Sequence, residues 1–465
     1  MVRLLSWGLL FLMAISDLTI WMSIAAWRAG VRRVVAVLAP FMIVLGCTRW
    51  LVQSTWWTLP HDNASTWVGF GLNWLTHSQW KTFHHPAYSV IELSGIVAWI
   101  AGLHPDQGLA GIEHMLAVGL AVQMGVLILV VVWSAWLLRH QSVMQTLAMA
   151  ALVATMPTVL IFTGWFSDNF LVGIVTLPCG ILLARFLRYG QSRLLAMGLL
   201  GALAANSFTM LPITGIVCMV IVRRQREMIG RAVLAWGVGW LLAANAFAPF
   251  YGLSMREALR QAMPGGGWPH DMPIWTALVM VPIVAGIAAL LWGFSTTGIV
   301  LIGGTVMTLG MSWRYLVTPI AFGLNVRTLL PLLILQTIAL LFLWEQVTPA
   351  WSRRITVGVL LVALASLGQA VVVDARETRS RRTSGALVDA RIEAFWATHP
   401  TGTAVCLRSE QDSRYCTMAY AYNRYRTIKS LRVWPSEMLM NGRLQWVRKT
   451  DTWHQEGDNL LRVGP

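Results

Sequence analysis

Long apolar runs separated by short arginine-bearing segments are the feature that most restricts how this chain can fold. Residues 34–53, 109–138, 143–166, 169–187 and 327–345 are examples, and a helix needs about 20 apolar residues to cross a bilayer. Of the 465 residues, 56% are hydrophobic and 12% are charged. Backbone groups in lipid must be satisfied within the segment, which selects helices. The sequence therefore predicts a polytopic α-helical membrane protein with about 11–12 transmembrane helices.

The formal net charge of +15 comes largely from arginines between the apolar runs. Arginine clusters at 28–33, 185–193, 223–231 and 353–354 mark cytoplasmic loops by the positive-inside rule. This pattern indicates membrane topology and does not favour nucleic acid as a partner. We expect a multi-pass protein of a bacterial inner membrane, in which the loop 61–86 and the C-terminal region both lie on the extracytoplasmic side.

Two N-terminal segments depart from a simple alternation of spans. Residues 87–103 are apolar but short and contain Glu92, which predicts an interfacial or re-entrant helix. Asp17 lies within the first run, 4–27, where a lipid-facing carboxylate would be costly. Two interpretations stay open: the first run enters the membrane without crossing it, or the N-terminus is external.

The composition changes near residue 375. Residues 375–465 are richer in charged residues, tyrosine and asparagine, and their apolar pieces are short. The sequence thus predicts two domains, a transmembrane domain over 1–374 and a small soluble α/β domain over 375–465. Cys406 and Cys416 lie in the second domain, and their spacing suits a hairpin disulfide in an oxidising compartment.

Carboxylates near two predicted outer helix ends are the candidates for catalysis. Asp62 lies in a histidine-rich polar loop, and Asp168 follows Ser167 at the tip of a later helical hairpin. A carboxylate at such a position can act as a general base. Either residue can instead cap the helix that follows, because Asp and Asn are common N-caps. The residues alone leave these alternatives open.

Polar and aromatic side chains predicted on the same side are candidates for substrate binding. Guanidinium groups suit phosphate, although outer arginines can also bind lipid headgroups without specificity. Ionisable residues at the start of a span usually face a cavity, and aromatic faces can stack on a sugar. The candidates are His61, Lys81, His84, His85, Glu113, His114, Arg256, Arg260, Trp268, Arg314, Tyr315 and Arg327.

Several of these motifs occur in an order that resembles a known family. Along residues 45–225 they are Asp62 in the first outer loop, an amphipathic segment, the turn His85-Pro86 and the second outer pair Ser167-Asp168. With the C-terminal soluble domain, this order is similar to the GT-C superfamily of integral membrane glycosyltransferases. The resemblance implies inverting transfer of a sugar from a polyprenyl-phosphate-linked donor to a glycan, lipid or protein acceptor. Asp62 matches the family's catalytic acidic position.

The sequence departs from the commoner GT-C pattern at two places. Asp62 is followed by Asn63 where many members have two acidic residues, and His84-His85-Pro86 is followed by Ala87 where many have a second proline. The outer side has few carboxylates for a hard cation. The sequence therefore indicates no definite cofactor, and a divalent metal is the less favoured alternative. The site residues would contact the donor, the acceptor and membrane lipids.

Two other functions share some of these sequence features. A transporter or flippase of lipid-linked glycans would also have many spans and a broken pair of helices such as the one at 206–212. Transporters often contain two related halves, and no such internal repeat is visible. A large, arginine-rich outer loop would favour a polymerase or ligase of envelope glycans. The loop 251–271 is only of modest size.

Overall fold

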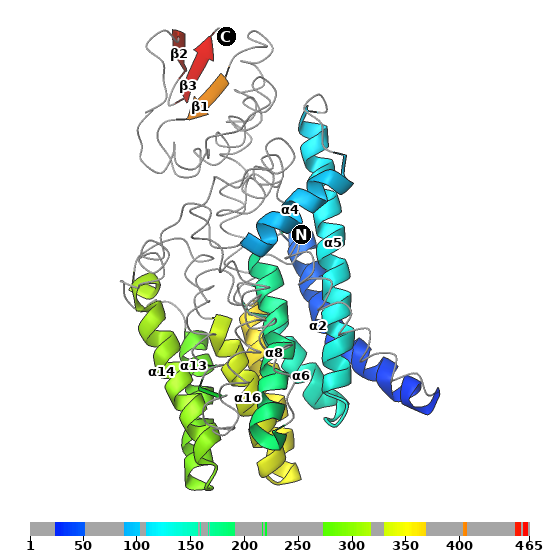
Figure 1. Cartoon of the computed structure of the whole chain (residues 1–465), viewed down its shortest axis with the longest axis vertical. Coiled ribbons are helices and arrows are strands. Elements are labelled where there is room, and N and C mark those ends of the chain that lie inside the picture. Colours follow the sequence, from blue (N-terminus) through cyan, green and yellow to red (C-terminus); the bar gives the residue numbers. More distant parts are fainter. Residues whose placement is uncertain are drawn as a thin grey trace.

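The computed structural model describes helices and short connections between residues 24 and 368 and three strands near the C-terminus. The described residues are 24–51, 88–102, 108–156, 159, 166, 168–190, 216, 219–220, 273–317, 330–368, 403–406, 452–456 and 459–463. Between 24 and 368 these residues are helical apart from turns (Figure 1).

Nine helices are described. They are α2 (Ile24–Leu51), α4 (Tyr88–Ile100), α5 (Gly108–Leu137), α6 (Val143–Ala154), α8 (Asp168–Tyr189), α13 (Pro273–Leu291), α14 (Ser295–Val317), α16 (Leu330–Gln346) and the helix Pro349–Gly368. Four of them contain windows long and apolar enough to cross a membrane: Gly30–Cys47, His114–Leu137, Phe170–Tyr189 and Pro349–Gly368. The predicted helical membrane character is confirmed. The predicted total of about 11–12 spans includes runs outside the described residues.

The helices form an elongated bundle (Figure 1) in which α8 packs against α5 and α16, and α2 packs against α5 and α6. Both the connection between α5 and α6 and the turn between α13 and α14 lie at one end. The last turns of α8 and α16 lie there too, because residues from all four places line a single cavity. We call this the basic end and define it by Arg33, Arg139, Arg185, Arg188 and Arg353.

Hydrogen bonds and glycines fix the turns at the basic end. Ser142 Oγ accepts from the Gln145 N–H at 3.2 Å, and Gln145 Oε1 accepts from the Ser142 N–H at 2.9 Å, which is a capping box at the start of α6. Gln145 also donates to Ser352 Oγ at 2.9 Å. Gly190, with φ of 64°, follows α8, and Gly293, with φ of 80°, forms the turn between α13 and α14. Both angles favour glycine.

Glycines also let helices approach closely inside the bundle. A Cβ atom added at Gly180 of α8 would lie 2.6 Å from Thr337 Cβ of α16, and one added at Gly304 of α14 would lie 2.8 Å from the Leu335 side chain. Small residues at such crossings permit close backbone packing between membrane helices.

Buried threonine hydroxyls are satisfied by backbone carbonyls one helical turn earlier. The hydroxyls of Thr155, Thr305, Thr308 and Thr337 each donate to the carbonyl four residues earlier, at 2.7–2.8 Å. This local bond removes the cost of a buried hydroxyl donor. A bond across the bundle is made by Ser366, whose Oγ donates to the Thr155 carbonyl at 2.9 Å.

Three predicted boundaries are corrected. The arginines at 28–33 were expected in a loop but lie within α2, since arginine is a good helix former. The run 143–166 was expected to be one span, but α6 ends at Ala154, shortly before Pro157, which disfavours helix at the residue preceding it. The apolar run 296–312 predicts a span that ends at 312 and is followed by an outer segment from Trp313, but α14 continues to Val317.

Helix α4 has only 13 residues, too few to cross a bilayer at 1.5 Å per residue. It contacts α5 and lies aslant near the upper part of that helix (Figure 1). Its length agrees with the expectation of an interfacial or re-entrant helix at 87–103, and its position relative to a membrane stays a prediction.

The C-terminal region contains an antiparallel sheet of three strands in the order β1-β3-β2. The strands are β1 (Thr403–Cys406), β2 (Thr452–Glu456) and β3 (Asn459–Val463). Leu460 pairs with Val405 on one side and with Gln455 on the other. The described residues after 368 are all in strands, so the α/β character of this domain stays a prediction, and Cys416 of the predicted disulfide lies outside the described residues.

Candidate functional site

Most of the residues that the sequence predicts for the site lie outside the described residues. This group contains the first catalytic candidate and most of the cationic candidates. It consists of His61, Asp62, Lys81, His84, His85, Arg256, Arg260, Trp268 and Arg327. Their roles stay predictions.

The other predicted residues lie on described helices, at the end of the bundle away from the basic end. Asp168 is the first residue of α8. Glu113 and His114 lie in the second turn of α5, and the His114 side chain is exposed. Arg314 and Tyr315 belong to the last turn of α14. We call this the opposite end, and it also contains the C-terminus of α2 and the N-terminus of α13.

These positions lie at one end because of the direction in which each helix runs. Helices α5, α8 and α13 begin at the opposite end and finish at the basic end, whereas α2 and α14 run the other way (Figure 1). This alternation follows the predicted order of outward and inward runs. Segments 52–87, 251–272 and 318–329, which contain the remaining candidates, are each joined in sequence to a described helix terminus of that same end.

A cavity of about 460 Å³ lies at the basic end, between α5, α8, α14 and α16. Its polar lining includes His140, Gln141, Arg185, Arg188, Tyr189, Ser295, Thr296, Thr297, Glu345 and Gln346. Its apolar lining includes Leu137, Ile181, Ile338 and Leu341. The sequence pattern indicates only a role in membrane topology for these arginines. The available signal was Arg185 and Arg188 at i,i+3 spacing, which places both on one helix face.

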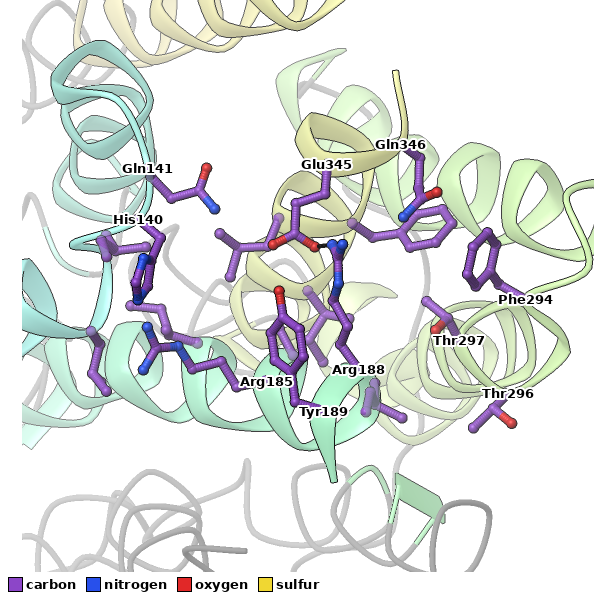
Figure 2. A pocket seen from close by; sticks show the side chains of 18 of the residues that line it. His140, Gln141, Arg185, Arg188, Tyr189, Phe294, Thr296, Thr297, Glu345 and Gln346 are labelled. Atoms are coloured by element: carbon purple, nitrogen blue, oxygen red, sulfur yellow. Dashed lines mark ion pairs between the residues drawn. The ribbon is translucent and has the colours of Figure 1, made fainter. Parts of the chain in front are cut away.

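Charge within this cavity is organised around the last turn of α8. Arg188 forms an ion pair with Glu345 of α16 and lies 5.2 Å from the ring centroid of Tyr189. Figure 2 shows Arg188 extending toward Glu345 and Arg185 extending toward His140. Among the described residues that line the cavity, Glu345 is the one carboxylate, so the lining is cationic overall.

Further arginines lie beside the connection between α5 and α6. Arg33 of α2 donates to the Gln141 carbonyl from Nη2 at 3.3 Å and from Nε at 3.4 Å. The Arg139 guanidinium carbon lies 4.4 Å from the ring centroid of Trp136. Partial burial, and then the charges of Arg139, Arg185 and Arg33, lower the pKa of His140 below its usual value of 6.5. His140 is therefore neutral at physiological pH.

The lowered pKa predicts how His140 contributes to the pH dependence of stability. The folded chain binds a proton at His140 less readily than the unfolded chain does. The contribution of neutral His140 to the free energy of unfolding is therefore fully present above the unfolded pKa of 6.5, and it is lost as the pH decreases below that value. We expect thermal unfolding at about pH 5.5 and about pH 7.5 to show a smaller acid-induced decrease in Tm for His140→Gln than for the parent. Equal decreases in Tm for the two proteins would contradict this assignment.

Metal-ligating side chains do not gather in the described part of the chain. Among the described residues, no three His, Cys, Asp or Glu side chains are grouped so that they could hold a metal ion. His61, His84 and His85 lie outside those residues. The expectation that a metal on the outer side is not favoured therefore stays a prediction.

No family model matches this chain, and no curated protein or solved structure gives a match. The resemblance to the GT-C superfamily therefore rests on the order of the motifs between residues 45 and 225 and on their predicted position on the same side of the membrane.

Proposed function

We propose that this chain is an inverting glycosyltransferase that moves a sugar from a polyprenyl-phosphate-linked donor to a glycan, lipid or protein acceptor. One observation carries the proposal. The described helices place Asp168, Glu113 and Arg314 at the opposite end of the bundle. The helix termini that join the loops of Asp62 and Arg256 lie at the same end. Residues far apart in sequence are thereby available to one site beside the membrane.

The reaction needs a base and a set of cations. In the proposed step, the acceptor oxygen forms a bond to the anomeric carbon from the face opposite the phosphate. The carbon–oxygen bond to the phosphate breaks, and the acceptor proton moves to the carboxylate of Asp62. Such a general base contributes about 100-fold to 10,000-fold. The leaving group remains an anion, and Arg256, Arg260 and Arg314 are the residues proposed to bind it.

The distribution of arginine supports an extracytoplasmic site. Arg33, Arg139, Arg185, Arg188, Arg353 and Arg354 mark one end of the bundle, which the positive-inside rule assigns to the cytoplasm. We infer that the opposite end, with the donor site and the C-terminal domain, faces the periplasmic side. A lipid-anchored donor would reach it by diffusing in the membrane.

A donor panel tests the proposed function. The purified full chain is incubated with polyprenyl-phosphate sugars that differ in the sugar, together with a crude envelope acceptor fraction. We expect one donor to release polyprenyl phosphate with the sugar recovered on an acceptor in the inverted configuration. Movement of labelled lipid-linked glycan across proteoliposomes without polyprenyl phosphate release would instead support the transporter alternative and overturn the proposal.

A further inference from the structure

We propose that the cavity at the basic end binds the phosphate headgroup of an anionic phospholipid. This inference is independent of the glycosyltransferase proposal, because the cavity and the predicted donor site lie at different ends of the bundle. The cavity volume of about 460 Å³ lies within the usual range of about 300–1,000 Å³ for small-ligand sites.

Cationic side chains on one helix face supply the first part of the site. Arg185 and Arg188 both line the cavity from the last two turns of α8. In Figure 2 their guanidinium groups point in different directions, with Tyr189 drawn between them. Guanidinium groups bind phosphate through paired N–H donors. Both arginines therefore contribute positive charge to the same cavity, Arg188 on the side of α16 and Arg185 on the side of His140.

Helix α14 supplies the second part. Its first residues, Ser295, Thr296 and Thr297, line the same cavity, and Figure 2 shows Thr297 on the cavity side of that helix. The first N–H groups of a helix have no acceptor within the helix, and the helix dipole favours an anion at this position. Hydroxyl and backbone donors thus face the same space as the arginines.

The walls distinguish a lipid from a soluble anion. The inner wall contains Ile181 and Ile338, which a free phosphate would not use. Phe342 also lines the cavity, and its ring lies 5.2 Å from that of Phe294 and 6.0 Å from that of Trp292.

Exposed apolar side chains beside the cavity indicate its depth in the membrane. Leu291, Trp292 and Phe294 are 80%, 48% and 41% exposed. Aromatic residues of this kind gather where headgroups meet hydrocarbon. The cavity therefore lies at the level of headgroups, and anionic lipids are enriched in the cytoplasmic leaflet.

Glu345 allows a test in which two substitutions change lipid binding in opposite directions. Its carboxylate holds Arg188 by an ion pair and repels any phosphate that enters the cavity. Removing this charge should strengthen lipid binding, whereas removing a cation should weaken it. A role that is only structural would not make the two substitutions act in opposite directions.

The test measures phospholipid retention by the full chain in a non-ionic detergent. Native mass spectrometry follows titration with phosphatidylglycerol or with phosphatidylethanolamine. We expect Arg185→Gln to weaken phosphatidylglycerol binding by about tenfold or more and Glu345→Gln to strengthen it by about threefold or more, in line with the usual strength of charged hydrogen bonds. Arg353→Gln is the matched control, because Arg353 is an exposed arginine of the same end that does not line the cavity.

Melting temperatures confirm that each variant is folded before binding is compared. Equal retention of phosphatidylglycerol by the parent and folded Arg185→Gln would overturn the proposal, and so would equal loss in Arg353→Gln. A separate arm adds inorganic phosphate at millimolar concentration. Displacement of phosphatidylglycerol at a similar concentration of phosphate would identify a soluble anion as the ligand and would also overturn it.

Discussion

Asp62→Asn is expected to reduce sugar transfer by at least about 100-fold, the lower part of the range for loss of a general base. Asparagine keeps the shape of aspartate but cannot accept the acceptor proton. Donor binding should change little, because the cations proposed to hold the phosphate are other residues. Polyprenyl phosphate release measured under saturating donor, together with donor affinity, checks both parts.

The helix-capping alternative for Asp62 makes a different forecast. Asparagine caps a helix about as well as aspartate, so a capping role leaves the enzyme active. Turnover by well-folded Asp62→Asn within about threefold of the parent would exclude the general-base role. Asp168→Asn is the matched control for the second carboxylate, and loss of activity only there would move the base to the start of α8.

Gly180→Ala is expected to cause a large loss of stability for the addition of one methyl group. The new Cβ would lie 2.6 Å from Thr337 Cβ, 2.9 Å from Thr337 Cγ2 and 3.1 Å from the Ile334 carbonyl oxygen. Thr337 is buried and its hydroxyl is bonded to the Leu333 carbonyl, so α8 and α16 must separate. Overpacking of this kind costs about 1–3 kcal/mol, measurable as a lower Tm in detergent.

Gly125→Ala is the matched control, since it is also a glycine within a membrane-spanning window. A Cβ at Gly125 has no neighbour within 4 Å, and alanine is the better helix former by about 1 kcal/mol. We expect its Tm to equal or exceed that of the parent. A Gly180→Ala protein as stable as the Gly125→Ala protein would show that the contact between α8 and α16 is looser than described.

Hydropathy was sufficient to predict the major helices. The run 169–187 corresponds to α8 (Asp168–Tyr189), and the run 109–138 corresponds to α5 (Gly108–Leu137). Such runs succeed because the cost of placing polar groups in lipid dominates every local preference. Boundaries in the basic segments failed, as at Arg28 to Arg33 of α2, because positive charge marks sidedness without ending a helix.

The cavity could not be predicted, because it depends on which helix termini meet. Arg188 and Glu345 are far apart in sequence, and only packing of α8 against α16 joins them. Hydropathy fixes neither the rotation of a helix nor its neighbours. For the predicted catalytic end, the sequence supplied the candidates and the helix directions, while most of the side chains lie outside the described residues.

The threonine hydroxyls that bond to their own helices have a consequence for how the protein is made. A helix such as α16, with Thr337 already satisfied by Leu333, presents no exposed hydroxyl donor at that position to the hydrocarbon. At that position α16 needs no polar partner from another helix in order to enter the membrane. Assembly can then proceed through shape alone at contacts such as Gly180 against Thr337, in keeping with insertion followed by association. The order in which helices are synthesised need not be the order in which they pair.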